Sequence, residues 1–206
     1  MTNASLLFEN AWNIEAEGID LSKARVSGRA TKANPGKEDV SFWKETGPKW
    51  VQGYIEWRAA NPDWKIWVAP DGNPAIELGL FPEIAGVPVK MVIDRIFEVN
   101  GELVIADLKT SKSVPVSPLQ LSFYRLGIKK QFGIDIKWGT YWMARQFGIS
   151  PMIDLNKYTD DMLEYLVENF DKARKSGIFL PNTSTCQYMC GLTEYCQFST
   201  KEVTNG

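Results

Sequence analysis

Two apolar segments flank Asn100-Gly101 and form the clearest hydrophobic pattern in the chain. Both segments, within residues 90–112, are rich in Val, Ile and Phe, which strands favour. An Asn-Gly pair is the strongest short-range hairpin signal, because both central residues of a type I′ turn need positive φ. Apolar residues occupy both faces of each segment, which is typical of strands covered on both sides. The pattern therefore predicts a buried β-hairpin over 90–112.

The same pattern places charged residues inside this apolar hairpin. With Asn100-Gly101 as the two-residue loop, Asp94 lies directly opposite Asp107. Lys109 follows Asp107 by two residues and so points to the same face. Like charges opposite each other destabilise a sheet, so the acidic pair indicates a divalent cation held between the two carboxylates. The alternative is a buried Asp–Lys ion pair, with Asp94 exposed at the sheet edge.

The oxygen donors of this hairpin suit magnesium. Mg²⁺ is usually held by one or two carboxylates together with waters and substrate phosphates, so Asp94, Asp107 and the Leu108 carbonyl are candidate ligands. A cation held there can activate water, and a neighbouring lysine can stabilise developing negative charge. Gln120 and Tyr124 share one face of the next predicted helix and can turn toward this site. The alternative for these two is a solvent-facing glutamine and a tyrosine at the edge of the core.

The remaining segments predict a mixed α/β domain with helices on both faces of the sheet. In chain order we expect a helix at 38–60, strands at 65–69 and 75–81, the hairpin, a helix at 117–132, a strand at 135–144 and a helix at 160–175. Gly47-Pro48 should kink or split the first helix, and Ser117 should cap the second. The last helix is amphipathic and is expected to face the core with Met162, Leu163, Leu166, Val167 and Phe170.

Composition narrows the classes of function. The 206 residues suffice for one sizeable domain, and a net charge of −2 argues against a broad basic nucleic-acid surface, though not against a local groove. The chain has no histidine, which excludes Ser-His-Asp and Cys-His catalysis and histidine-ligated zinc. It also has no GxxxxGK[ST] or GxGxxG motif, so nothing indicates a nucleotide motor or a dinucleotide enzyme.

The role expected for the cysteines depends on whether the protein is in a reducing or an oxidising compartment of the cell. The sequence has no run of 18 apolar residues and no signal peptide, so we expect a cytoplasmic protein with no membrane partner. In that reducing setting the three cysteines, Cys186, Cys190 and Cys196, are more typical of metal ligands than of a disulfide framework. Thiolates suit an iron–sulfur cluster or zinc.

Two segments, IDRIFEVNGELVIADLKTSK and PLQLSFY, resemble the core of the PD-(D/E)XK nuclease superfamily in its RecB-like branch, which includes the CRISPR-associated exonucleases. That branch has an Asp-Arg pair on one strand, D-x-K-T on the next and Q-L-x-x-Y on a helix. The matching positions here are Asp94, Asp107, Lys109, Gln120 and Tyr124. The resemblance implies Mg²⁺- or Mn²⁺-dependent DNA cleavage, with both acids as metal ligands.

The resemblance also implies a fold and a function. The fold is a restriction-endonuclease-like mixed β-sheet flanked by helices, forming a single domain over 1–206 with its core at about 38–175 and a cysteine-bearing loop at 181–198. The function is an exonuclease or endonuclease that acts on single-stranded or end-bearing DNA in repair, recombination or the processing of phage and mobile-element DNA. A protein partner or homo-oligomer is compatible with it. One alternative is a catalytically weak or inactive nucleic-acid-binding module with the same fold, and another is a hydrolase of small phosphoesters.

The sequence departs from that branch on the N-terminal helix and in the tail, where the first cysteine spacing is one residue longer than the usual C-x₂-C. Members usually carry a metal-ligating histidine on the N-terminal helix, for which Gln52 and Glu56 are the candidate replacements here. Many members also hold an iron–sulfur cluster with tail cysteines and one cysteine far upstream, which this chain lacks. Three options stay open: a cluster with a non-cysteine fourth ligand, a cluster or zinc site completed by another chain, or a degenerate site that binds nothing.

Overall fold

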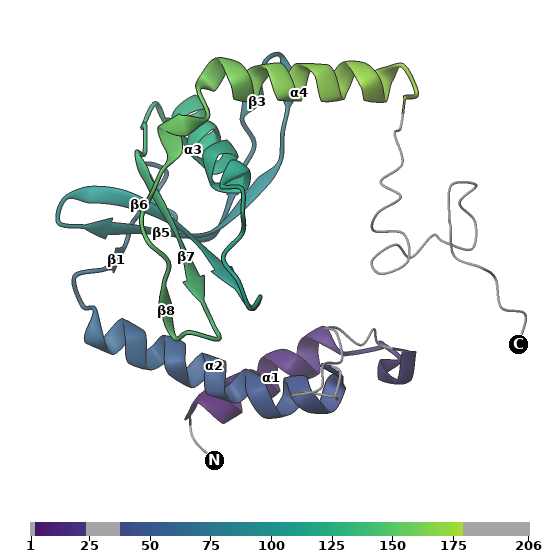
Figure 1. The fold of residues 1–206 in the computed structure, drawn as a ribbon, viewed down its shortest axis with the longest axis vertical. Helices are drawn as coiled ribbons and strands as arrows, with labels where there is room; N and C mark the ends of the chain where they lie inside the picture. The colour runs from purple at the N-terminus through teal and green to yellow at the C-terminus, as the bar shows by residue number, and fades with distance from the viewer. Residues whose placement is uncertain (1–2, 24–37, 179–206) are drawn as a thin grey trace, which may run out of the picture.

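The structure, a computed structural model, describes residues 3–23 and 38–178 and consists of a curled mixed sheet flanked by four helices (Figure 1). This is the restriction-endonuclease-like architecture expected from the sequence. The helices are α1 (Asn3–Glu15), α2 (Val40–Ala60), α3 (Leu119–Phe132) and α4 (Asp160–Lys175), with short 3₁₀ turns at Leu21–Lys23 and Leu155–Lys157. The main sheet comprises β1 (Lys65–Ile66), β2 (Ile76–Leu80), β5 (Met91–Val99), β6 (Glu102–Lys109), β7 (Trp138–Met143), β8 (Gly148–Ile149) and β9 (Ile153–Asp154).

The hairpin of β5 and β6 forms the middle of this sheet, with the predicted register. Val99 pairs with Glu102, and the ladder runs on to Arg95 opposite Ala106. Asn100 and Gly101 have φ of 52° and 79°, the left-handed values that a type I′ turn requires. The predicted turn is therefore confirmed. β7 lies parallel to β6 on the far side, and this parallel pair is connected through α3.

The two strands expected at 65–69 and 75–81 are present as β1 and β2, and both pair with the same strand, β5. β1 pairs Lys65 with Glu98, and β2 pairs Ile76 with Arg95. The turn between them is closed by a bridge from Val68 to Pro74. A second, two-stranded sheet that the sequence analysis did not predict follows, made of β3 (Glu83–Ile84) and β4 (Val87–Pro88).

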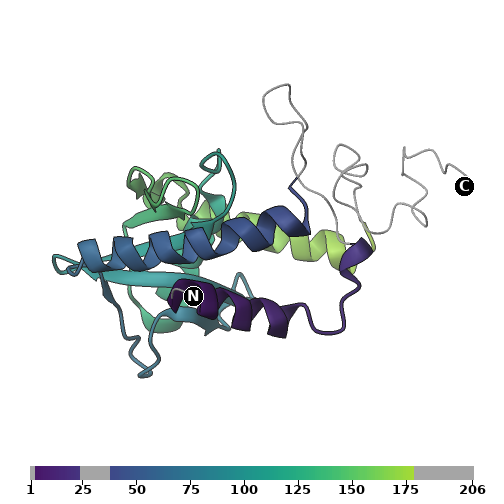
Figure 2. The ribbon, with the colours of Figure 1, turned by 90° about the horizontal axis from the view of Figure 1, so that it is seen from below.

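The two faces of the sheet are covered by different helices. On one face α3 packs over the main apolar core, which includes Ile93, Ile96, Ile105, Leu121 and Leu126. On the other face α2 packs edge to face with Trp57 on Phe97 and with Tyr54 on Trp142. α1 lies beside α2 on the outside (Figure 2).

α2 runs unbroken past Gly47-Pro48, so of the two predicted outcomes, a kink or a split, the split was wrong. Asp39 caps the helix, and its Oδ1 accepts a hydrogen bond of 2.9 Å from the backbone N–H of Phe42. A Cβ at position 47 would lie 2.0 Å from a ring carbon of Phe8 in α1. The close packing of α1 on this glycine accounts for a helix that local propensity would interrupt.

α3 begins one residue later than predicted. Pro118, expected inside the helix, occupies the N-cap position, and Ser117 is not the cap residue. The Ser117 hydroxyl still accepts a hydrogen bond of 3.3 Å from the Leu119 N–H. The side chain of Arg125 on α3 is buried and forms ion pairs with Asp160, at the start of α4, and with Asp135. These ion pairs fix α4 against α3.

α4 has the predicted bounds, but only part of its apolar face is covered. Leu163 is fully buried and Val167 packs partly against the core. Met162, Leu166 and Phe170 are 49%, 43% and 73% exposed, which corrects the expectation that all five face the core. α4 packs against α3 and the β3–β4 hairpin and makes no extensive contact with the main sheet, so only one edge of the helix is covered.

We expect Gly101→Ala to lower the free energy of unfolding by about 1–2 kcal/mol, because alanine in the left-handed region incurs a steric cost of that size. Urea denaturation followed by tryptophan fluorescence measures the change. Asn100→Gly is the matched control and should leave stability nearly unchanged, since glycine also adopts a φ of 52°. Equal midpoints for wild type and Gly101→Ala would contradict the assigned turn.

Candidate active site and metal centre

The strands β5 and β6 separate where the two aspartates lie. Their ladder ends at Arg95 opposite Ala106, one pair before the position at which Asp94 would face Asp107. β6 continues beside β7 as far as Lys109. At the fork Asp94 Oδ2 accepts a hydrogen bond of 2.8 Å from the backbone N–H of Leu108. The carboxylate thus replaces a backbone acceptor and lies against the Asp107–Leu108 segment.

Asp107 is a buried acid with unused acceptor capacity. The residue is 2% exposed, and Lys109 Nζ lies 2.6 Å from its Oδ2. This ion pair is the partner of Oδ2, which is buried and accepts no further hydrogen bond among the described residues. Buried polar atoms are normally satisfied, and each exception calls for an explanation. The Lys109 ammonium is one cation at this oxygen, and a metal ion would bind beside it or in its place.

The charges around Asp107 change its proton affinity. Burial raises the pKa of Asp107 above its ordinary value, the Lys109 ammonium opposes this rise, and the negative charges of Asp94 and Glu77 add to it. Burial also raises the pKa of Tyr124, and the same three carboxylates contribute to that rise. Negative charge is therefore concentrated at this point of the sheet, and a divalent cation would offset it.

A chain of polar contacts links Asp107 to α3. Lys109 Nζ donates a hydrogen bond of 3.2 Å to Gln120 Oε1, and Gln120 Nε2 donates one of 2.8 Å to Tyr124 Oη. Gln120 and Tyr124 are one helical turn apart on the face of α3 that looks onto β6. The structure therefore brings all five predicted catalytic residues into one contiguous group.

The donor set at the fork fits a hard divalent cation. Among residues 3–23 and 38–178, no three Asp, Glu or Cys side chains lie close enough together to hold a metal. The ligands that the chain offers here are thus the carboxylates of Asp94 and Asp107, with the Leu108 carbonyl as a further candidate. Two carboxylates completed by waters and substrate oxygens match the usual Mg²⁺ site.

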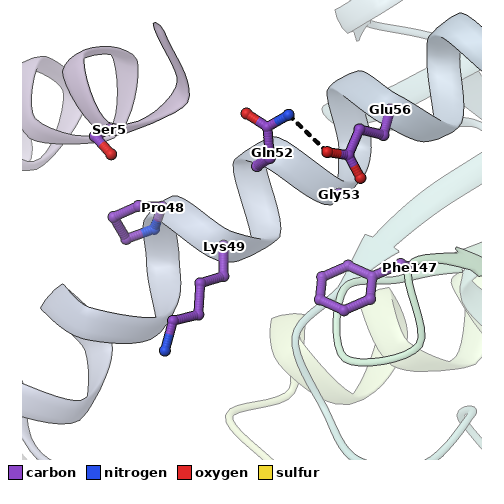
Figure 3. A pocket seen from close by; sticks show the side chains of 7 residues that line it. All are labelled: Ser5, Pro48, Lys49, Gln52, Gly53, Glu56 and Phe147. Atoms are coloured by element: carbon purple, nitrogen blue, oxygen red, sulfur yellow. Dashed lines mark hydrogen bonds between the residues drawn. The ribbon is translucent and has the colours of Figure 1, made fainter. Parts of the chain in front are cut away.

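The two candidate replacements for the missing histidine are hydrogen-bonded to each other. Figure 3 shows Gln52 and Glu56 on one side of α2, in a pocket that also includes Phe147, from the loop after β7. Gln52 Nε2 donates a hydrogen bond of 2.8 Å to Glu56 Oε1. None of the acids at the fork lines this pocket. The structure assigns neither residue a contact with Asp94 or Asp107, and their role as replacements stays a prediction.

Two acids with partners in the structure were not predicted from the sequence, Glu77 near the fork and Glu38 just before α2. Glu77 of β2 acts electrostatically on Asp107, and only the β2–β5 register, which the sequence did not provide, could have identified it. Glu38 is buried and pairs with Arg145 at 2.9 Å and with Lys112 at 3.4 Å. These pairs hold the segments that follow β7 and β6 against the start of α2. The predicted cysteine ligands Cys186, Cys190 and Cys196, and the loop at 181–198, lie outside the described residues.

The fold and the residues define the class of site: two strands separate, with an aspartate on one strand and Asp-x-Lys on the next. The chain belongs to the PD-(D/E)XK nuclease superfamily, whose family model matches residues 6–197. It is similar to the Gene 69 protein of Mycobacterium phage D29, with 31% identity over 168 residues, and to that of Mycobacterium phage L5, with 28% identity over 187 residues. Each match covers 78% of this chain, and the chain spans 61% and 63% of the length of these two relatives. No described helix is both long and apolar enough to cross a bilayer.

We expect Asp107→Asn to raise stability at neutral pH in EDTA. Because the pKa of Asp107 is raised in the folded state, that state binds the proton more tightly than the unfolded state does. Wild-type stability therefore falls as pH rises from the ordinary carboxyl pKa of about 3.9 through the raised value. Asn at this position removes that loss. Urea midpoints across pH 3 to 8 measure the effect.

The control for this experiment is Asp63→Asn, which changes an exposed acid. Its stability should follow that of wild type at every pH. The gap between Asp107→Asn and wild type should widen as pH rises and close below about pH 4. A gap that is constant with pH, or a less stable Asp107→Asn at pH 7, would show that the buried charge is not a cost to the fold.

Proposed function

We propose that this chain is a metal-dependent deoxyribonuclease of the RecB-like type that hydrolyses phosphodiester bonds. The observation that carries the proposal is the buried Asp107 carboxylate, which lies beside Asp94, is paired with Lys109 and is connected through Lys109 to α3. A structural ion pair alone would need neither a second acid nor a polar chain into the next helix. Membership of the nuclease superfamily supports the same conclusion.

The proposed roles follow from the contacts. Asp94, Asp107 and the Leu108 carbonyl would hold Mg²⁺ or Mn²⁺, which supplies Lewis acidity and lowers the pKa of water when bound. Lys109, 27% exposed, faces both Asp107 and solvent and can stabilise negative charge on a phosphoryl group. Gln120 orients the Lys109 ammonium through its amide oxygen. Tyr124 would contact a substrate phosphate or base through its hydroxyl.

The biological setting is inferred from the relatives. Both are phage proteins, which favours DNA as the substrate and the processing of phage DNA, through repair or recombination, as the context. The RecB-like resemblance favours exonucleolytic action on DNA ends in the cytoplasm. The three tail cysteines stay candidates for an iron–sulfur or zinc site, completed within the chain, by a protein partner or by a second copy.

A catalytically inactive DNA-binding module is the second candidate function. The observation that favours it is that Gln52 and Glu56 of α2 are hydrogen-bonded to each other and line a pocket without Asp94 or Asp107, while the chain has no histidine. Such a module would keep the fold and bind DNA without cutting it.

Cleavage of end-labelled single- and double-stranded DNA in Mg²⁺, Mn²⁺ or EDTA tests the proposal. We expect cleavage that requires the cation, and a fall of at least about 100-fold in Asp107→Asn and Lys109→Ala, because removing one group that stabilises transition-state charge costs about that much. Tyr124→Phe and Gln120→Leu should lose less, since they act through positioning. Lys65→Ala, which removes an exposed lysine at the edge of the sheet, is the matched control and should cut like wild type.

The outcomes separate the two functions. Metal-dependent cleavage that persists in Asp107→Asn would show that the active site does not lie at the fork. Tight DNA binding with no cleavage in either cation would favour the inactive module.

A further inference from the structure

A groove along α4 is lined by apolar side chains. It has a volume of about 1100 Å³ and is formed by residues of α4, the start of α3 and the β3–β4 hairpin with the segment after it. Its apolar lining includes Val87, Val89, Leu119, Phe123, Leu166 and Phe170. Leu166 and Phe170 are 43% and 73% exposed. A continuous exposed apolar surface of this kind marks a binding surface.

The chain leaves α4 at one end of this groove. The Ile178 N–H donates a hydrogen bond of 2.9 Å to the Ala173 carbonyl, and the Gly177 N–H donates one of 3.1 Å to the Arg174 carbonyl. With a φ of 69° at Gly177, these are the two bonds of a Schellman motif, which ends the helix and turns the chain away from its axis (Figure 1). Arg174 and Lys175, in the last turn, line the groove. Residues 179–206 therefore continue from a point beside it.

The segment that follows has the composition of a packed segment. Residues 179–198 contain one charged side chain, that of Glu194. Their large apolar residues are Phe179, Leu180, Tyr188, Met189, Leu192, Tyr195 and Phe198. Segments that stay solvated are typically rich in charge and poor in such residues, so this one is suited to bury its side chains against a surface.

The segment is also long enough to reach the whole groove. The residues of α4 that line it run from Leu166 to Lys175, a helix length of about 14 Å. An extended chain covers that distance with about five residues. Residues 179–198 can therefore run back along α4 with chain to spare.

The charges at the groove fit an occupant with little charge of its own. Asp171 pairs with Arg174 at 2.7 Å and with Lys175 at 2.6 Å, so the cations at this end are already matched within α4. Lys90, on the opposite side, lies over the Phe81 ring at 5.9 Å. Recognition therefore depends on the apolar lining, which matches the tail better than it matches a strongly charged partner.

We propose that residues 179–198 fold back along α4 and bury their apolar side chains in this groove. The docked segment covers Leu119 and Phe123, each of which directly precedes a residue of the proposed active site, Gln120 and Tyr124. It thereby braces the part of α3 that carries those two side chains. The inference does not depend on the proposed function, because its test measures proximity and not cleavage.

Site-specific photocrosslinking of the full chain tests the inference. A benzophenone amino acid is introduced at Asn169, an exposed residue that lines the groove, and in a second protein at Lys90 on the opposite side. Glu168 is the matched control position, since it is the neighbouring residue of α4, is exposed and does not line the groove. After irradiation, mass spectrometry of tryptic peptides measures the product that joins each position to residues 179–198, and a denaturing gel separates monomeric from dimeric products.

We expect the monomeric product from position 169 to exceed that from position 168 by at least about tenfold, the factor that burial of one large apolar side chain contributes to an equilibrium. An undocked segment would meet both positions at the same effective concentration, because they are adjacent in the helix. Phe170→Glu places a charge in the groove at a side chain that is 73% exposed, and it should lower the yield from position 169 to that of position 168.

Three results would overturn the inference. Equal yields from positions 168 and 169 would show that the segment does not dock. A product that is mainly dimeric would assign the groove to a second copy of the chain. Absence of any product with residues 179–198 from both position 169 and position 90 would leave the groove to a different protein.

Discussion

The hydrogen bond from the Leu108 N–H to the Asp94 carboxylate fixes the point at which the central hairpin opens. A buried backbone donor must find an acceptor, and here β5 supplies a side chain where a regular ladder would supply a carbonyl. β5 stays paired with β2 and β6 stays paired with β7, so each strand keeps a neighbour beyond the fork. The sheet therefore loses few backbone hydrogen bonds where the hairpin opens. The opening also keeps Asp94 and Asp107 from facing each other directly, which would be destabilising in a closed ladder.

This arrangement destabilises the folded state mainly through the burial of the Asp107 carboxylate. A carboxylate that is 2% exposed loses most of its hydration, and one partly exposed lysine repays only part of that loss. Gln120 restrains the same lysine, so the ammonium is oriented before any substrate arrives. Natural sites often sacrifice stability for such preorganisation, and the raised pKa of Asp107 indicates where this chain does so. Arg125, buried on the same helix, is compensated by acids on two sides and serves the fold.

The sequence predicts the parts of the site that depend on local chemistry. The Asn100-Gly101 turn determines the hairpin register, and the four-residue spacing of Gln120 and Tyr124 determines their common face. Features set by tertiary packing cannot be predicted from the sequence pattern. The exposure of Phe170 depends on where α4 docks, the unbroken α2 depends on Phe8 packing at Gly47, and the position of Glu77 depends on a left-handed residue in a strand. No local pattern encodes these three features, because each is decided by elements distant in sequence.

The absence of histidine has a chemical consequence for the fork. The proposed metal ligands at the fork are two carboxylates and a backbone carbonyl, so the proposed ligand set consists of oxygen alone. Imidazole and thiolate ligands favour zinc, copper and other borderline or soft ions, whereas carboxylates, carbonyls and water suit magnesium, calcium and manganese. Of these, Mg²⁺ keeps several waters and needs few protein ligands, which matches a fork with two acids, while Ca²⁺ takes six to eight oxygens in a larger shell. A proposed ligand set made of oxygen alone is therefore selective for such hard cations through its chemistry.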